Sequence, residues 1–531
     1  MKHITFFISI FIAACLSAQP TLVNQRTVGG SSNDELSSMD ITKDGGFIIG
    51  GTSSSTTSFE KTDSSRGYTD YWIVKLNRNG TIQFDKTFGS DSYDELNALQ
   101  QTKDGGYILG GLSWGGKTGD KSDTNRHDGF AFQDYWIVKL DAAGNKQWDK
   151  TFGGYQIDEL NALQQTKDGG YILGGSSSSV VSGEKTDGCR GVADDYWIIK
   201  IDNTGTIQWD KTIGGTGYDN LTAIKQTADG GYIIGGWSES PISYEKTDYC
   251  RGASDYWIVK LDKFGNIQWD KTIGGTAGDL LRSIDITADG GYILGGYSGS
   301  NISGEKTENS RGMGDYWIVK IDASGNIQWQ KTIGGTSDER LFSIHQSKDG
   351  GYILGGYSNS NISGEKTENS KGNYDYWVVK TDGTGNIQWQ KTIGGSNEDD
   401  LMAVEEVGDN YLLAGSSKSG ATGDKTQNRR GQDFDYWTVL LRDTAAALST
   451  AKNTSQANGK AFSVYPNPAK NVLYIQTTGK AVYTLSNSSG KIYKTISIEN
   501  NESVDVSKVP AGLYFITNTT TGKKQSVIID K

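Results

Sequence analysis

The chain contains few of the residue types that most directly carry metal, redox or nucleophilic chemistry. Among 531 residues there are 3 cysteines, 3 histidines and 4 methionines. It also lacks a nucleophile elbow, a phosphate-binding loop and a recognisable metal-ligand cluster. The sequence therefore predicts no cofactor and gives no direct sign of an enzyme.

An excess of basic residues and a long apolar run are missing too. The formal charge is −11 and the isoelectric point is near 5.0, whereas nucleic-acid binding needs a concentrated basic surface. We therefore expect no nucleic-acid partner. The apolar stretch 4–14 is shorter than the roughly 20 residues that span a bilayer, so no transmembrane span is expected.

The first residues have the pattern of an export signal. A basic residue precedes the apolar stretch 4–14, and small residues precede Gln19. This order predicts a cleaved signal peptide over residues 1–18. A competing interpretation is a lipoprotein signal in which Cys15 is lipidated.

What the chain has in abundance is an internal repeat. Asp-Tyr-Trp begins seven times, at intervals of 60 to 64 residues: Asp70, Asp134, Asp195, Asp255, Asp315, Asp375 and Asp435. A fixed period of this size marks one supersecondary unit that must stack on its own copies. The 71 glycines and 11% aromatic residues fit many short strands joined by glycine turns.

Each repeat contains four strand-like segments, which in the fifth copy are residues 281–287, 292–298, 316–321 and 327–333. Glycine turns that supply positive φ should pair consecutive segments antiparallel. Four antiparallel strands per repeat predict an all-β propeller over residues 19–443. We expect seven blades, with the N-terminal segment 22–28 completing the last one.

The repeat resembles known propeller families. Gly295-Gly296 ends the second segment, tyrosine lies in the third and tryptophan in the fourth, as in kelch repeats. The spacing of Asp322, Gly325 and Trp329 is similar to the tryptophan-docking motif of quinoprotein propellers. The resemblance covers residues 21–442 and implies a fold rather than a function. The copper ligands of galactose oxidase, a kelch-type enzyme, have no counterpart, and seven units depart from the eight usual in quinoproteins.

A second region follows the repeats. Residues 444–461 are small and polar and predict a flexible linker, and residues 462–531 predict a small β-sandwich-like module. This module resembles the type A C-terminal sorting domain of Bacteroidetes type IX secretion cargo. The resemblance implies passage through the type IX machinery, then release or attachment at the cell surface. It rests mainly on Tyr465, Pro466, Asn467, Pro468, Gly512, Leu513 and Tyr514.

Consecutive turns of an antiparallel blade lie on alternating faces, so the seven long loops are predicted to share one face of the propeller. Binding residues usually lie on such loops. The second blade's loop, residues 112–133, is the longest and departs most from the repeat. One interpretation is a site for an acidic glycan, with His127 as base and Arg126 neutralising a carboxylate. The other is a tolerated insertion with its own apolar cluster. The binding candidates of this loop are Trp114, Lys117, Arg126, His127 and Phe130.

The other loops repeat a motif that contains Glu305, Lys306 and Arg311 in the fifth copy. It predicts either a salt-bridged, solvated loop or a repeated polar site supported by calcium, although no dense run of acidic residues supplies six to eight oxygens. Trp317 and Trp329 recur in register and predict core packing rather than sugar-stacking platforms. Asp315 should bond nearby backbone amides.

Cys189 and Cys250 occupy equivalent positions in successive repeats. In an exported protein this predicts a disulfide between neighbouring loops, and the alternative is two free thiols. His345 stands where other repeats carry varied polar residues, which predicts no special role for it.

These observations predict an exported, surface-bound or secreted monomeric propeller that binds a glycan or protein partner through its long-loop face. A polysaccharide hydrolase or lyase, endoglucanase-like in kind, is the second hypothesis. A structural surface or adhesion component is the third.

Overall fold

The structure is a computed structural model that describes residues 19–127, 132–191, 193–443, 462–465, 469–477, 480–487, 491–499, 502–520 and 524–530. It divides into two compact units, Met1–Thr444 and Ala445–Lys531, and each is described by itself. The predicted signal peptide, the predicted linker, Phe130 and residues 466–468 lie outside the described residues.

In the first unit, each repeat forms a four-stranded antiparallel sheet, called a blade below. The first blade contains β2 (Asp34–Ile41), β3 (Phe47–Ser53), β4 (Asp70–Leu76) and β5 (Ile82–Phe88) in spatial order. The second contains β6 (Asp94–Gln101), β7 (Tyr107–Ser113), β8 (Asp134–Leu140) and β9 (Lys146–Phe152). The third contains β10 (Asp158–Gln165), β11 (Tyr171–Ser177), β12 (Asp195–Ile201) and β13 (Ile207–Ile213).

The next three blades repeat this order. The fourth contains β14 (Asp219–Gln226), β15 (Tyr232–Ser238), β16 (Asp255–Leu261) and β17 (Ile267–Ile273). The fifth contains β18 (Asp279–Ile286), β19 (Tyr292–Ser298), β20 (Asp315–Ile321) and β21 (Ile327–Ile333). The sixth contains β22 (Glu339–Gln346), β23 (Tyr352–Ser358), β24 (Asp375–Thr381) and β25 (Ile387–Ile393).

The last sheet joins the two ends of the repeat region. It contains β26 (Asp399–Val407), β27 (Asn410–Ser417) and β28 (Asp435–Arg442), and its fourth strand is β1 (Thr21–Val28). Strand β1 pairs antiparallel with β28, from Val28 opposite Tyr436 to Thr21 opposite Arg442. The described residues of this unit therefore form seven four-stranded sheets.

The glycine turns form the hairpins as expected. In the fifth blade Gly290 has φ 83°, and its N–H donates to Thr287 O at 2.9 Å. Gly325 also has φ 83° and closes the turn between β20 and β21. A side chain with Cβ rarely adopts this conformation, so these two turns require glycine.

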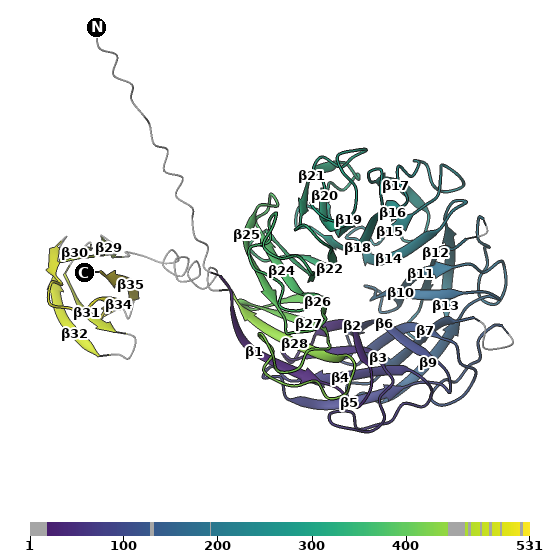
Figure 1. The fold of residues 1–531 in the computed structure, drawn as a ribbon, viewed down its shortest axis with the longest axis horizontal. Coiled ribbons are helices and arrows are strands. Elements are labelled where there is room, and N and C mark those ends of the chain that lie inside the picture. Colours follow the sequence, from purple (N-terminus) through teal and green to yellow (C-terminus); the bar gives the residue numbers. More distant parts are fainter. Residues whose placement is uncertain are drawn as a thin grey trace, which may run out of the picture. The chain divides into compact units, whose positions relative to one another are not determined.

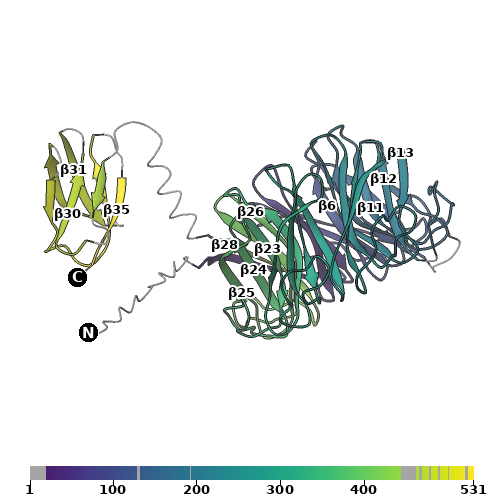
Figure 2. The same cartoon turned by 90° about the horizontal axis from the view of Figure 1, so that it is seen from above.

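Neighbouring blades share an aromatic core. The Tyr71 hydroxyl donates to Trp136 O at 3.0 Å, and the two rings lie 4.8 Å apart. The third-strand tryptophans, including Trp317, are fully buried. First strands of adjacent blades contact one another and face the middle of the unit, whereas fourth strands such as β17 and β21 lie at its periphery (Figure 1). Figure 2 shows the blades standing side by side.

The second unit consists of two small antiparallel sheets. One contains β29 (Ser463–Tyr465), β30 (Val472–Gln476) and β33 (Glu502–Asp505). The other has the order β32 (Ile492–Ile498), β31 (Ala481–Asn487), β34 (Gly512–Asn518), β35 (Lys524–Ile529). Buried residues of both sheets, among them Leu473, Tyr483 and Ile516, form one apolar core. Tyr514 is buried in it and Leu513 is exposed.

Candidate ligand site on the long-loop face

The loop between the second and third strands of each blade meets the segment that crosses to the next blade. In the first two blades, the Tyr68 N–H donates to Ser92 O at 2.9 Å. The Trp114 N–H donates to Tyr93 O, also at 2.9 Å. These bonds join backbone atoms only. They bring Tyr68, Tyr93 and Trp114 together without using the side chains of the three residues.

These three aromatic residues line an open pocket of about 590 Å³, together with Asp91, Ser92 and Glu95. The rings of Tyr68 and Tyr93 are stacked, with centroids 4.7 Å apart and an interplanar angle of 18°. Trp114 meets Tyr93 edge-on at 6.0 Å. Tyr68 is 64% exposed and Tyr93 is 45% exposed, so much of this aromatic surface faces solvent. We call the six lining residues the aromatic pocket.

The aromatic pocket breaks the repeat. Six other residues make the backbone bond that Trp114 makes, and none of them is aromatic: Ser54, Ser178, Glu239, Gly299, Asn359 and Lys418. The acceptors of those bonds, which correspond to Tyr93, are Asn33, Ile157, Tyr218, Gly278, Asp338 and Glu398. Both positions vary from blade to blade, so the packing that the repeats share does not determine which residue stands there.

Glu95 supplies a carboxylate to the pocket from the start of β6. Burial raises its pKa, and the charges of Glu159 and Glu35, at the matching positions of the neighbouring blades, raise it further. A carboxyl group that is more readily protonated can donate or accept a hydrogen bond. The pocket thus combines apolar ring surfaces with one adaptable polar group.

The structure places the predicted site residues of the second blade's loop in different surroundings. Trp114 lines the aromatic pocket, whereas Lys117, Arg126 and His127 are not among its lining residues. Arg126 forms a bidentate ion pair with Glu184 of the third blade, at 2.7 Å from both Nε and Nη2. His127 lies edge-on to Phe132 at 5.0 Å. A local ring contact of this kind is compatible with the alternative interpretation, a tolerated insertion.

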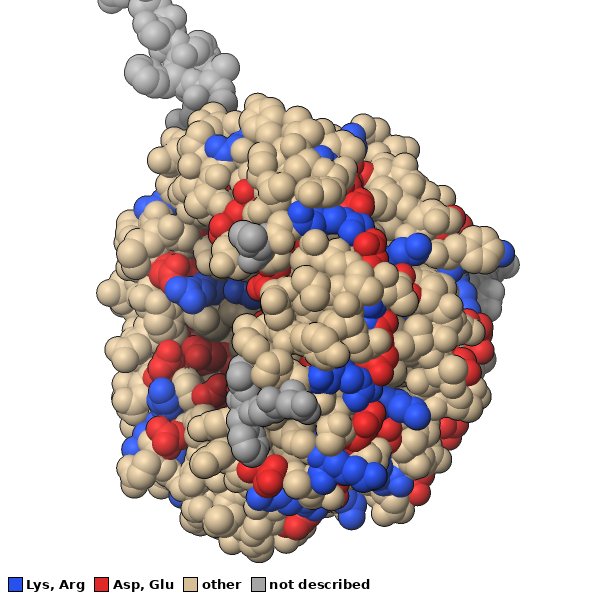
Figure 3. Space-filling model, turned by 90° about the vertical axis from the view of Figure 1, so that its right-hand side faces the viewer, with Lys and Arg blue, Asp and Glu red and all other residues tan. Residues whose placement is uncertain are grey.

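The Arg126 ion pair is one of a series. In every blade, a loop cation pairs with a loop carboxylate of the next blade: Arg66–Asp120, Arg126–Glu184, Arg190–Glu245, Arg251–Glu305, Arg311–Glu365, Lys371–Asp424 and Arg430–Glu60. Glu305 and Arg311, predicted as binding residues, therefore connect blades. On the side of the molecule shown in Figure 3, Lys and Arg lie beside Asp and Glu.

Lys306 is buried, whereas the sequence predicted a solvated position for it. Its side chain is buried, its Nζ donates to Thr332 Oγ1 at 2.6 Å, and it lies 5.2 Å from the Trp317 ring centroid. Burial lowers the pKa of Lys306 to about 8, against the raising effect of Asp279 and Asp315. Lys306 thus belongs to the interior of its blade.

Asp315 also has a structural role. One carboxylate oxygen accepts the Arg311 N–H at 2.7 Å, as expected. Burial raises the pKa of Asp315 to about 7. Equivalent contacts recur for Asp255 and Asp435, so this residue organises the loop in each blade.

The predicted disulfide is absent, and Cys189 and Cys250 are free. Each thiol donates within its own blade, Cys189 to Ser177 O at 2.7 Å and Cys250 to Ser238 O at 3.2 Å. The corresponding Ser310 hydroxyl donates to Ser298 O at 2.8 Å. The two sulfurs therefore occupy a repeated hydrogen-bonding position inside separate blades, which is why they do not pair.

Two first-strand residues near the middle of the unit are unusual. His345 lies 3.8 Å from Asp285 and 3.6 Å from Glu405. Burial lowers the pKa of His345, but these carboxylates outweigh it and raise the pKa overall. Arg282 lies over the Phe342 ring at 5.5 Å, and its Nε has no hydrogen-bond partner among the described residues. Burial lowers the pKa of Arg282.

Across the described parts of the chain, no group of three or more His, Cys, Asp or Glu side chains is arranged to hold a metal ion. The described residues form no helix with the length and hydropathy of a membrane span.

Comparison with known families identifies the second unit. Residues 463–530 match the family described as "Secretion system C-terminal sorting domain". This match agrees with the resemblance inferred from the sequence, and the protein is secreted through the type IX system to the cell surface or extracellular space. The first unit, which precedes this sorting domain in the sequence, is a set of propeller-like blades.

Similar proteins say less about the first unit. The "Regulatory protein FlaEY" of Caulobacter vibrioides is 25% identical over 478 residues, which cover 83% of this chain. The chain spans about half, 48%, of the length of that relative. Among solved structures, Sqt1 from Chaetomium thermophilum has a TM-score of 0.39 and 13% identity, covering 79% of this chain and 99% of that one. Puromycin hydrolase has a TM-score of 0.43 and 8% identity, covering 85% and 59%.

Proposed function

We propose that this protein is an exported binding protein that holds a glycan in the aromatic pocket of its long-loop face. The observation that carries the proposal is the group of Tyr68, Tyr93 and Trp114, whose stacked tyrosine rings are largely open to solvent. A second cluster of three rings, formed by Phe342, Tyr357 and Tyr374, is half-buried. Rigid aromatic faces stack on the apolar faces of sugar rings, and nearby polar groups fix the orientation of the sugar.

The electrostatic character of the pocket also fits a neutral sugar. Asp91 and Glu95 offer hydrogen-bond acceptors, whereas Ser92 is buried. Within the part of the chain that the structure describes, no lysine or arginine lines the pocket, so a strongly anionic ligand has no partner there. Hydroxyl groups of a neutral glycan match this lining best.

We also infer that the seven blades close into a ring, which gives the pocket a rigid support. Strand β1 pairs with β28 and continues directly into the first blade. The Tyr436 hydroxyl donates to Trp72 O at 3.0 Å, as Tyr71 does to Trp136 O between the first two blades. Both the hydrogen bonding and the ion-pair series are thus the same across this joint.

One observation favours a second function, polysaccharide hydrolysis. The carboxyl group of Glu95 lies in the aromatic pocket and has a raised pKa, which is the property required of a general acid. A hydrolase would need a second carboxylate across the bound sugar. Asp91 is the candidate, because it is the other carboxylate that lines the pocket.

A glycan array probed with the purified full-length protein tests both functions, provided that every bound glycan is also assayed for reducing-end or unsaturated products. Binding that is lost in Tyr93→Ala and retained in Tyr218→Ala supports the proposed site. Product release that disappears in Glu95→Gln while binding remains would establish the second function. Absence of glycan binding would contradict the proposal.

A further inference from the structure

Six of the seven joints between blades contain the same aromatic contact. A fourth-strand ring of one blade meets a tyrosine at the start of the next blade's second strand, with centroids 5.6 to 6.3 Å apart. The pairs are Phe84–Tyr107, Trp148–Tyr171, Trp209–Tyr232, Trp269–Tyr292, Trp329–Tyr352 and Trp389–Tyr411. We call the fourth-strand ring the plug of its joint.

The plug packs closely on the turn between the third and fourth strands of the next blade. A Cβ atom added to Gly385 would lie 2.8 Å from Cζ3 of Trp329, closer than atoms in contact can approach. The plug therefore fills its joint completely, and the neighbouring turn must carry glycine there.

The seventh joint, between the last and first blades, has no plug among its described residues. Asn24 lies opposite Leu440 in the β1–β28 pairing, as Phe84 lies opposite Lys75 in the first blade. Asn24 therefore occupies the plug position. Phe47 replaces the tyrosine, and a Cβ atom added to Gly80 would lie 3.6 Å from Asn24 Nδ2 and contact nothing nearer.

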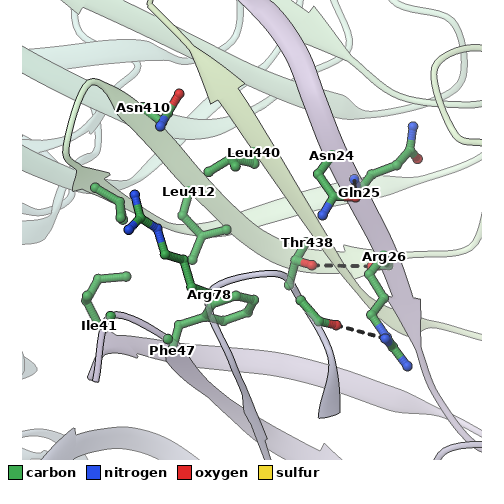
Figure 4. Close-up of a pocket in the computed structure, with 14 residues that line it drawn as sticks. Asn24, Gln25, Arg26, Ile41, Phe47, Arg78, Asn410, Leu412, Thr438 and Leu440 are labelled. Atoms are coloured by element: carbon green, nitrogen blue, oxygen red, sulfur yellow. Dashed lines mark hydrogen bonds between the residues drawn. The ribbon is translucent and has the colours of Figure 1, made fainter. Parts of the chain in front are cut away.

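A cavity of about 80 Å³ lies at this joint. Asn24 and Arg26 of β1, Phe47, Leu412 and Leu440 are among its lining residues, together with Arg78 (Figure 4). The Arg26 guanidinium already donates to Gly80 O at 2.8 Å. Arg78 is exposed and forms no ion pair or hydrogen bond within the described residues.

We infer that the joint between the last and first blades is a binding site for a small planar aromatic carboxylate. The six filled joints show that an aromatic ring is the group that fits between the two blades at this position. Apolar side chains would contact one edge of the ring in this cavity of about 80 Å³, the rest of the ligand would lie outside it, and the unpaired Arg78 would bind the carboxylate. This inference does not depend on the proposed glycan site, which lies on other residues.

With the predicted signal peptide removed, the segments that adjoin this cavity offer no ring for it. Strand β1 carries no aromatic residue, and residues 444–461, which follow the last blade, carry none. Phe6, Phe7 and Phe11 precede β1 but lie in the predicted signal peptide, residues 1–18. We therefore infer that the occupant of this cavity is an external ligand. Because such a ligand contacts both blades, it would also stabilise the joint that β1 completes.

The test is titration of the full-length protein with indole-3-acetate, followed by calorimetry and by the unfolding temperature. The wild-type protein should bind this probe and unfold at a higher temperature in its presence. Asn24→Trp, which supplies a plug, should abolish binding and raise the unfolding temperature without the probe. If Asn24→Trp does not fold, Asn24→Phe, which reproduces the smaller plug of Phe84, replaces it.

Arg78→Met is the matched variant for the charged group. It should weaken indole-3-acetate binding by about tenfold, the loss typical of one charge-assisted hydrogen bond, and leave binding of uncharged indole nearly unchanged. Tyr93→Ala should bind indole-3-acetate as the wild type does. Failure of the wild type to bind the probe, or equal binding by Asn24→Trp, would overturn the inference.

Discussion

The guanidinium of Arg430 in the last blade lies 2.6 Å from the carboxylate of Glu60 in the first blade. Arg430 Nε also donates to Glu60, at 2.8 Å, so the pair is bidentate. Arg190 and Glu245 make the same contact between the third and fourth blades, with both distances at 2.8 Å. In this ion pair the joint between the chain ends matches an internal one.

This equivalence predicts that breaking the pair at the chain ends also lowers stability. Arg430→Met should lower the free energy of unfolding by about 1 kcal/mol, because it removes a partly buried bidentate pair. Arg190→Met should cost at least as much, because Arg190 also pairs with Asp187 at 2.7 Å. Urea unfolding of the two variants measures this cost. A loss in Arg190→Met without one in Arg430→Met would contradict the inferred closed ring.

Lys306 predicts how stability depends on pH. Its pKa is about 8 in the folded protein and about 10.4 when unfolded. Between these values the unfolded chain binds more protons, so the free energy of unfolding should rise as pH increases from about 8 to about 10. Lys306→Met should remove up to about 1.4 kcal/mol per pH unit from this rise. An unchanged slope in the variant would show that the folded lysine titrates normally.

Because both thiols are free, we expect that neither Cys189 nor Cys250 is needed for stability. Cys189→Ser and Cys250→Ser place a hydroxyl where Ser310 already donates to a second-strand carbonyl. Each variant should match the wild type in unfolding free energy within about 0.5 kcal/mol. Reducing agent should leave the unfolding temperature unchanged. A reductant-induced decrease would instead restore the disulfide hypothesis.

Arg282 predicts an unusual stabilising substitution. Its Nε is buried without a hydrogen-bond partner among the described residues, and it packs on the Phe342 ring. The side chain is partly exposed, so the cost lies in its shielded Nε, and an apolar side chain of similar length avoids that cost. Arg282→Met should therefore raise the free energy of unfolding by up to about 1 kcal/mol. A destabilised variant would mean that solvent or an anion already satisfies the guanidinium.

The strands were predictable from the sequence because their signals are local. The expected segments 292–298 and 327–333 coincide with β19 and β21, since alternating apolar residues and glycine turns determine where a short strand begins and ends. The roles of individual side chains depend on distant partners. Arg126 pairs with Glu184, 58 residues away, and no local pattern indicates that contact.

The residues that sequence reasoning missed are Tyr68, Tyr93, Glu95 and Asn24. A comparison of the seven repeats position by position would have revealed Tyr68 and Tyr93, but not Glu95, because Glu35 and Glu159 occupy the matching positions. It would also have shown Asn24 in a position otherwise occupied by phenylalanine or tryptophan. The loop of the second blade drew attention by its length instead, and only Trp114 from it reaches the aromatic pocket.

The most direct test of the central claim compares glycan binding by the wild type, Tyr93→Ala and Tyr218→Ala. Tyr93 and Tyr218 occupy equivalent positions and are similarly exposed, at 45% and 51%, but only Tyr93 is stacked within the aromatic pocket. Loss of one stacking face should weaken binding by about tenfold. We expect this loss in Tyr93→Ala alone. Equal binding by all three proteins would contradict the proposed glycan site.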